Sequence, residues 1–195
     1  MNVIQEDERF SSFLINTTIG KVLLFGVHFQ SKNSHSSDAL KSIISKYFKD
    51  FLNIEKERKI DKTIIIGDFN VNPYDKVMID ALSVNSVMNR KVASRNTRKA
   101  IGIKKYYFYN PMWHLMGNYK RDVQGSYYLS SKYDTIYWHT IDQIIVRPKL
   151  MEVIDIEKIL FITKTDNINL LTSNGLPDKK ISDHLPLLAE IELEV

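Results

Sequence analysis

The chain has 195 residues, with 27 basic and 23 acidic side chains and a formal net charge of +4. This length suits one domain, so residues 1–195 are expected to share a single fold. A hydrophobic content of 44% excludes an extensively disordered chain. The longest apolar run, Val22–Val27, is far shorter than the about 20 residues of a membrane-spanning helix. No signal peptide is recognisable and cysteine is absent, so we expect a cytoplasmic protein without disulfides or membrane association.

The first third of the chain predicts two strands and a helix. Residues 1–9 are polar, and we expect them to be disordered. Phe10–Thr17 and Lys21–Phe29 are rich in apolar residues and predict a strand pair. Ser36 or Ser37 then caps a helix with one apolar stripe. The residues of that stripe are Leu40, Ile43, Ile44, Tyr47, Phe48, Phe51 and Leu52.

The rest of the chain adds more strands than helices. Three consecutive isoleucines in Thr63–Gly67 predict a strand buried on both faces. Asn72-Pro73 predicts a helix start, and Pro111–Met116 predicts a second short helix. Four further strands are expected, at residues 125–129, 136–146, 153–163 and 187–193. This mixture of hairpins and helical crossovers predicts an α+β sandwich of two packed sheets with outer helices.

Positive charge is concentrated in one segment. Ala81–Arg121 contains nine basic residues and no acidic residue, whereas the other 154 residues carry 18 bases and 23 acids. Such segregation can focus anionic ligands, although a solvated helix face is the simpler interpretation. Aromatic residues also gather nearby; most are expected in the core, but an exposed few could stack on bases. We expect a nucleic-acid contact from residues of this segment, namely Arg90, Arg95, Arg98, Lys99 and Lys104.

Gly67-Asp68-Phe69-Asn70 directly follows the isoleucine strand. Asp68 and Asn70 are two positions apart, so in an extended chain both side chains point to the same face. A carboxylate that holds a water beside an amide that donates to a phosphate oxygen would suit hydrolysis. An Asx-turn that caps the next helix is the alternative.

Two later segments also place polar residues where core packing does not require them. Asp142 interrupts the apolar strand Ile141–Val146, and a buried carboxylate needs a partner. His184, in Ser182-Asp183-His184-Leu185-Pro186, is the candidate partner because carboxylates orient catalytic imidazoles. A structural pairing of Asp142 with an arginine is the alternative. Asp183 would point away from His184 and could bind a cation.

Together and in this order, these segments resemble the endonuclease/exonuclease/phosphatase superfamily. Val27-His28-Phe29, at the end of a strand, completes the similarity, which extends from Phe10 to the C-terminus. The resemblance implies a four-layered α/β/β/α sandwich and hydrolysis of phosphoesters with Mg²⁺ or Mn²⁺.

The resemblance also implies a role for each matching residue. Asp68 would position or deprotonate the attacking water, and Asn70 would hold Asp68 and a phosphate oxygen. His184 would contact the phosphate, with Asp142 behind it. His28 would touch the phosphate or the leaving group. Asp183 would be the metal ligand.

The chain departs from the family pattern at its N-terminus. Members begin with a strand ending in Asn and another ending in Gln-Glu, whose Glu binds metal; here the domain looks N-terminally shortened. Gln5-Glu6 has the local pattern without the usual long connection, so Glu6 is either a replacement ligand or part of a disordered end. Missing strands would leave an unpaired edge beside Lys21–Phe29, which would favour a homo-oligomer or pairing with a second chain.

The leading functional hypothesis is a metal-dependent phosphodiesterase that cleaves nucleic acid, with DNA favoured over RNA. One alternative is a phosphatase or phospholipase C-like hydrolase of inositol phosphates or phospholipid headgroups. The other alternative is an incomplete or inactive module that binds phosphates or a partner.

Overall fold

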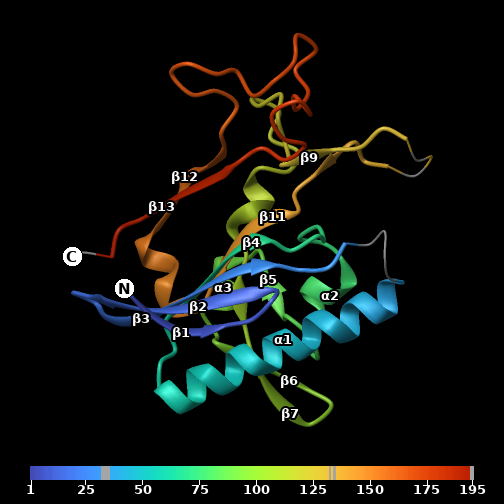
Figure 1. The fold of residues 1–195 in the computed structure, drawn as a ribbon. Coiled ribbons are helices and arrows are strands. Elements are labelled where there is room, and N and C mark those ends of the chain that lie inside the picture. The colour runs from blue at the N-terminus through green and yellow to red at the C-terminus, as the bar shows by residue number, and fades with distance from the viewer. Residues whose placement is uncertain (32–35, 132, 134, 194–195) are drawn as a thin grey trace.

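The computed structural model describes residues 1–31, 36–131, 133 and 135–193. At its centre is a mixed seven-stranded sheet with the strand order β1-β2-β3-β4-β11-β8-β5 (Figure 1). Its strands are β1 (Asn2–Glu6), β2 (Phe10–Thr17), β3 (Gly20–His28), β4 (Thr63–Asp68), β5 (Ser86–Val87), β8 (Phe108–Tyr109) and β11 (Asp142–Val146). Three strand pairs lie outside this sheet: β6 (Thr97–Ala100) with β7 (Ile103–Tyr106), β9 (Tyr127–Tyr128) with β10 (Trp138–His139), and β12 (Ile154–Phe161) with β13 (Leu187–Ile191).

One face of the central sheet is covered by the long helix α1 (Ser37–Arg58) (Figure 1). The Ser36 side chain accepts a hydrogen bond from the Ala39 backbone N–H, which confirms the predicted cap. The buried stripe of α1 packs on β3, where the Phe51 and Phe25 ring centroids are 4.3 Å apart. The largest core cluster therefore lies between α1 and the sheet.

The opposite face packs against a second core cluster formed with β12 and β13. The α+β class is confirmed, but the second sheet has only these two strands. Over the described residues, this side carries short helical turns rather than a second long helix. They are α3 (Arg90–Ala93) and the 3₁₀ turns η1 (Pro111–His114) and η2 (Pro148–Val153).

Three expectations about local structure are wrong. Residues 2–6 are not disordered: β1 pairs antiparallel with β2 over four residue pairs. β3 lies between β2 and β4, so the segment 21–29 has no unpaired edge. The helix expected at Asn72 begins only at α2 (Lys76–Ile79), because the Asn72 carboxamide oxygen accepts from the Thr140 backbone N–H instead of capping.

The sheet topology brings the ends of three strands together. β3 and β4 are parallel neighbours, and their last residues, His28 and Asp68, are paired in register. β11 runs antiparallel to β4, so its first residue, Asp142, lies directly opposite Asp68. Three of the predicted site residues thus meet at one edge of the sheet.

Candidate active site

Gly67 allows β4 to approach β3 closely just before Asp68. Its φ of +139° favours glycine, and a Cβ there would lie 2.1 Å from the Val27 carbonyl oxygen. Asn70 follows in the left-handed region with φ of 54°. Its backbone N–H and side-chain amide donate to the two oxygens of Asp68, at 2.7 and 2.8 Å. The alternative holds only in part: an Asx-type turn is present and orients Asp68, but it does not cap α2, whose N-cap residue makes no side-chain capping hydrogen bond.

The predicted hydrogen bond between Asp142 and His184 is confirmed. His184 Nδ1 donates to Asp142 Oδ2 at 2.8 Å, so its tautomer and ring direction are fixed. The expected alternative, an arginine partner for Asp142, is absent from the contacts of the described residues. The segment before β13 is held by the Leu185 backbone N–H, which donates to the Ser126 carbonyl.

Asp68, Asp142 and His184 form one electrostatic unit, with ligand atoms within 4.8 Å of one another. Burial, and then the Asp142 charge, raise the pKa of Asp68 to about 6, although Asn70 and the two histidines oppose this. The hydrogen bond to Asp142 raises the pKa of His184, and the Asp68 charge adds to it. Near neutral pH, a basic carboxylate therefore lies beside an imidazole that is biased toward its charged form.

His28 is at the open side of this unit. Its Nε2 lies 3.7 Å from Asp68 Oδ2, and its side chain is 70% exposed. The structure therefore brings together all five residues that the sequence proposed as catalytic: His28, Asp68, Asn70, Asp142 and His184.

A pocket of about 650 Å³ opens over the unit and includes Asn70 and His184 in its lining. Asp183 is exposed and lines the same pocket, but it is not one of the three clustered ligand groups. Asp68 and Asp142 offer the carboxylate oxygens that a hard divalent cation prefers, and such an ion would offset the repulsion between them. The residues present thus fit a divalent metal, with Asp183 as an additional carboxylate at the rim.

Sequence reasoning missed three groups in this site. The Tyr127 ring lies 5.2 Å from the His184 ring, centroid to centroid, and Ser126 Oγ accepts from the Asp142 backbone N–H. His139, which matched no motif, also lines the pocket, and its Nδ1 accepts from the Asn72 side chain at 3.0 Å. The signal was the aromatic-rich stretch around β9, but periodicity alone does not show which rings face a pocket.

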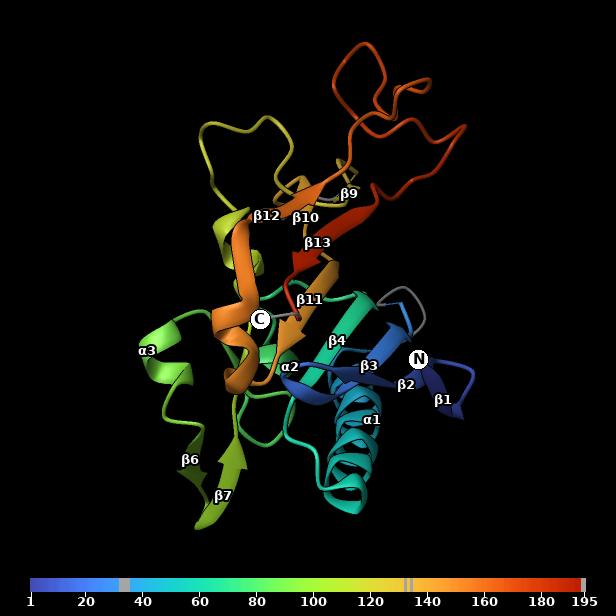
Figure 2. The same ribbon diagram turned by 90° about the vertical axis from the view of Figure 1, so that its left-hand side faces the viewer.

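Within the basic segment, we expect Arg90–Lys105 to border the site and contact nucleic acid, but this expected position is wrong. The β6–β7 hairpin extends from the end of the molecule opposite to β9 (Figures 1 and 2). Two arginines of this stretch are engaged within the protein: Arg90, on α3, donates to Glu152, and Arg98, on β6, donates to the Ile79 carbonyl. Lys104 lies over the Tyr106 ring.

Glu6 lies at the end of β1, three strands from β4 in the sheet order. Three inter-strand steps of about 4.8 Å place its backbone about 14 Å from β4. Glu6 is not among the clustered ligand groups of the described residues.

In the described chain, no helix is long and apolar enough to cross a membrane. No protein-family model and no curated protein matches the sequence. Among solved structures, a variant of the 3′ phosphatase NExo from Neisseria, bound to a product DNA hairpin, is 12% identical with a TM-score of 0.47. The 3′-5′ exonuclease NExo from Neisseria meningitidis is 13% identical with a TM-score of 0.45. A conserved protein of unknown function from Enterococcus faecalis V583 is 17% identical with a TM-score of 0.48.

These matches cover 94–96% of this chain but only 55–66% of the matched chains. The chain thus spans less than two thirds of the length of the solved proteins to which it is similar.

Proposed function

We propose that this protein is a divalent-metal-dependent phosphodiesterase that cleaves nucleic acid. The observation that carries the proposal is the hydrogen-bonded Asp142–His184 pair directly beside the oriented carboxylate of Asp68. Three segments far apart in the sequence supply these groups, and each segment carries a motif of the same superfamily.

Asp68 acts on the attacking water. Asn70 holds both carboxylate oxygens, and a pKa of about 6 leaves Asp68 ionised yet basic enough to accept a proton at neutral pH. His184, charged with the help of Asp142, faces the phosphate and stabilises the negative charge that develops on its oxygens. His28, exposed beside Asp68, contacts the phosphate or the leaving group.

Mg²⁺ or Mn²⁺ would be held by Asp183 together with a carboxylate of the clustered pair. When bound, the ion supplies charge neutralisation at the phosphoryl group. DNA is the preferred substrate class in this proposal, and the pocket over Asn70 and His184 receives the scissile phosphate.

The test is cleavage of plasmid DNA and of labelled DNA and RNA oligonucleotides with Mg²⁺, Mn²⁺ or EDTA. Asp68→Ala and His184→Ala should each lower the rate by about 10²–10⁴-fold, and EDTA should abolish cleavage. Asp155→Ala is the matched control, because Asp155 is an exposed carboxylate on β12 outside the site. Release of phosphate from inositol phosphates without nucleic-acid cleavage would identify the alternative substrate class. No hydrolysis of either substrate would overturn the proposal.

A further inference from the structure

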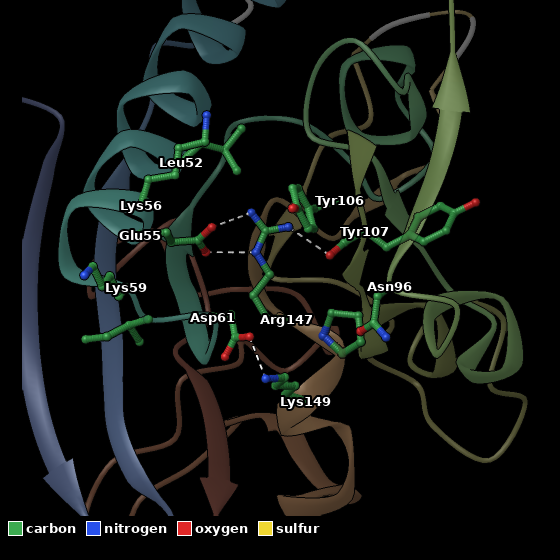
Figure 3. Close-up of a pocket in the computed structure, with 12 residues that line it drawn as sticks. Leu52, Glu55, Lys56, Lys59, Asp61, Asn96, Tyr106, Tyr107, Arg147 and Lys149 are labelled. Carbon is green, nitrogen blue, oxygen red and sulfur yellow. Dashed lines mark hydrogen bonds and ion pairs between the residues drawn. The ribbon is translucent and has the colours of Figure 1, made fainter. Parts of the chain in front are cut away.

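Two cavities at the far end of the sheet form one groove between α1 and β7, here called the α1–β7 groove. Their volumes are about 310 and 460 Å³, and both are lined by Leu52, Tyr106 and Arg147. Figure 3 shows the smaller cavity, with Lys56 and Lys59 on the α1 side and Tyr106 and Tyr107 on the other. Arg147 binds the Thr63 carbonyl through its backbone N–H, so the groove lies at the start of β4. Five residue steps along β4, about 17 Å, separate that end from Asp68.

The groove has a strong positive charge. Its lining includes seven cationic side chains, Lys46, Lys49, Lys56, Lys59, Lys105, Arg147 and Lys149, and only two anionic ones, Glu55 and Asp61. Both anionic groups are neutralised: Glu55 by a two-point ion pair with Arg147, and Asp61 by Lys149 at 2.6 Å (Figure 3). The charge that remains in the groove comes from five lysines.

Four of those lysines form a row. Lys46, Lys49 and Lys56 are exposed on one side of α1, and Lys59 is its C-cap residue. At 1.5 Å per residue, the row is about 20 Å long. A row of this length can follow several consecutive phosphates of an extended strand.

The β6–β7 hairpin, on the other side of the groove, also carries several basic residues, and their arrangement lowers the stability of the hairpin. Arg98 faces Lys105 across the two strands, and Lys99 faces Lys104. Like charges directly opposite each other destabilise a strand pair. A polyanion in the groove would offset the repulsion of the Arg98–Lys105 pair, because Lys105 lines the groove, whereas the segment 81–121 contains no acidic residue to do so.

We propose that the α1–β7 groove binds the phosphodiester backbone of a single-stranded nucleic acid. The choice of ligand rests on the proposed function. The lysine row and Lys105 bind successive phosphates, and Tyr106, 49% exposed between the two cavities, stacks on an unpaired base. The groove is thus a second contact for a substrate strand, remote from the site where the strand is cleaved.

The test measures binding without cleavage, in EDTA, by fluorescence anisotropy of a labelled single-stranded 20-mer. The variant Lys49→Ala/Lys105→Ala removes one lysine from each side of the groove. Two lost phosphate contacts should lower the salt slope by about 1.4 and weaken binding about 20-fold at 0.1 M salt. Tyr106→Leu should weaken binding about tenfold without changing the salt slope.

The matched control is Lys21→Ala/Lys164→Ala, which removes the same charge from exposed positions outside the groove. Equal weakening by this control would overturn the proposal, because net charge alone would then explain binding. Preferential binding of duplex DNA, or of anionic phosphatidylserine vesicles, that is lost in Lys49→Ala/Lys105→Ala would also overturn it. The groove proposal stands if the 20-mer binds as expected while no substrate is cleaved, and in that case only the proposed hydrolysis fails.

Discussion

Asp68 and Asp142 lie directly opposite each other on the antiparallel strands β4 and β11. Neighbouring carboxylates at such a position repel, and this repulsion, after burial, is the second cause of the raised pKa of Asp68. His184 compensates by donating to Asp142. The candidate site therefore contains a repulsion between two carboxylates that lowers the stability of the fold.

The first prediction is that the metal-free protein loses stability as the pH rises from about 4 to 6. The pKa of Asp68 is about 6 in the folded state, against 3.8 for an aspartate of the unfolded chain. Between these two pH values the folded state therefore holds a proton that the unfolded state has lost. The contribution of Asp68 to stability must then fall with rising pH, by about 3 kcal/mol over this range. The raised pKa of His184 also makes stability fall with rising pH, but at higher pH values. Urea unfolding in EDTA at several pH values measures this.

Asp68→Asn should flatten that pH dependence, because it removes the group that titrates. Asp155→Asn, at an exposed position, should leave it unchanged. If the wild-type protein became more stable between pH 4 and 6, the raised pKa assigned to Asp68 would be wrong.

The second prediction concerns Gly67. Gly67→Ala should lower the free energy of unfolding by about 3 kcal/mol or more, because the new Cβ would overlap the Val27 carbonyl at an unfavourable φ. Gly26→Ala is the control, since a Cβ at Gly26 meets nothing within 4 Å. Similar losses for the two variants in chemical denaturation would contradict a special role for Gly67.

The third prediction concerns the buried ion pair between Glu55 and Arg147. Arg147 is 4% exposed and also lies 3.7 Å over the Phe108 ring. Glu55→Gln should cost about 3–5 kcal/mol, because it leaves the guanidinium buried without its counter-charge. The exposed pair Asp61–Lys149 is the control, and Asp61→Asn should cost less than about 1 kcal/mol. Equal effects in thermal unfolding would show that burial does not decide the strength of these pairs.

Much of the central sheet can be predicted from local sequence. The segments 10–17 and 21–29 match β2 and β3 closely, and the isoleucine run matches β4. Apolar runs rich in β-branched and aromatic residues favour strands strongly. β1 was not predicted because it is short and mostly exposed, with only Val3 and Ile4 as apolar residues, and it depends on pairing with β2. Asn72 looked like a helix cap, but a tertiary contact with Thr140 uses its side chain.

The candidate site was predictable as a set of residues and in one contact, the Asp142–His184 hydrogen bond, but the rest of its geometry was not. Motif order identified Asp68, Asp142 and His184, whereas the direct opposition of the two aspartates depends on the register of strands far apart in sequence. For the same reason, the basic segment could not be assigned to an end of the sheet. Its position after Asn70 in the chain did not predict its position in space.

The last prediction concerns the metal ligand. Mn²⁺ should bind the isolated chain weakly, near or above millimolar concentration, because few carboxylates hold it without substrate phosphates. Asp183→Asn should weaken this binding further, since Asp183 lines the pocket over the clustered carboxylates. Glu6→Ala should leave it unchanged, because Glu6 lies three strands from β4. Titration by electron paramagnetic resonance measures free Mn²⁺ directly. Sub-millimolar binding that is lost in Glu6→Ala would make Glu6 the principal ligand and contradict the assignment of Asp183.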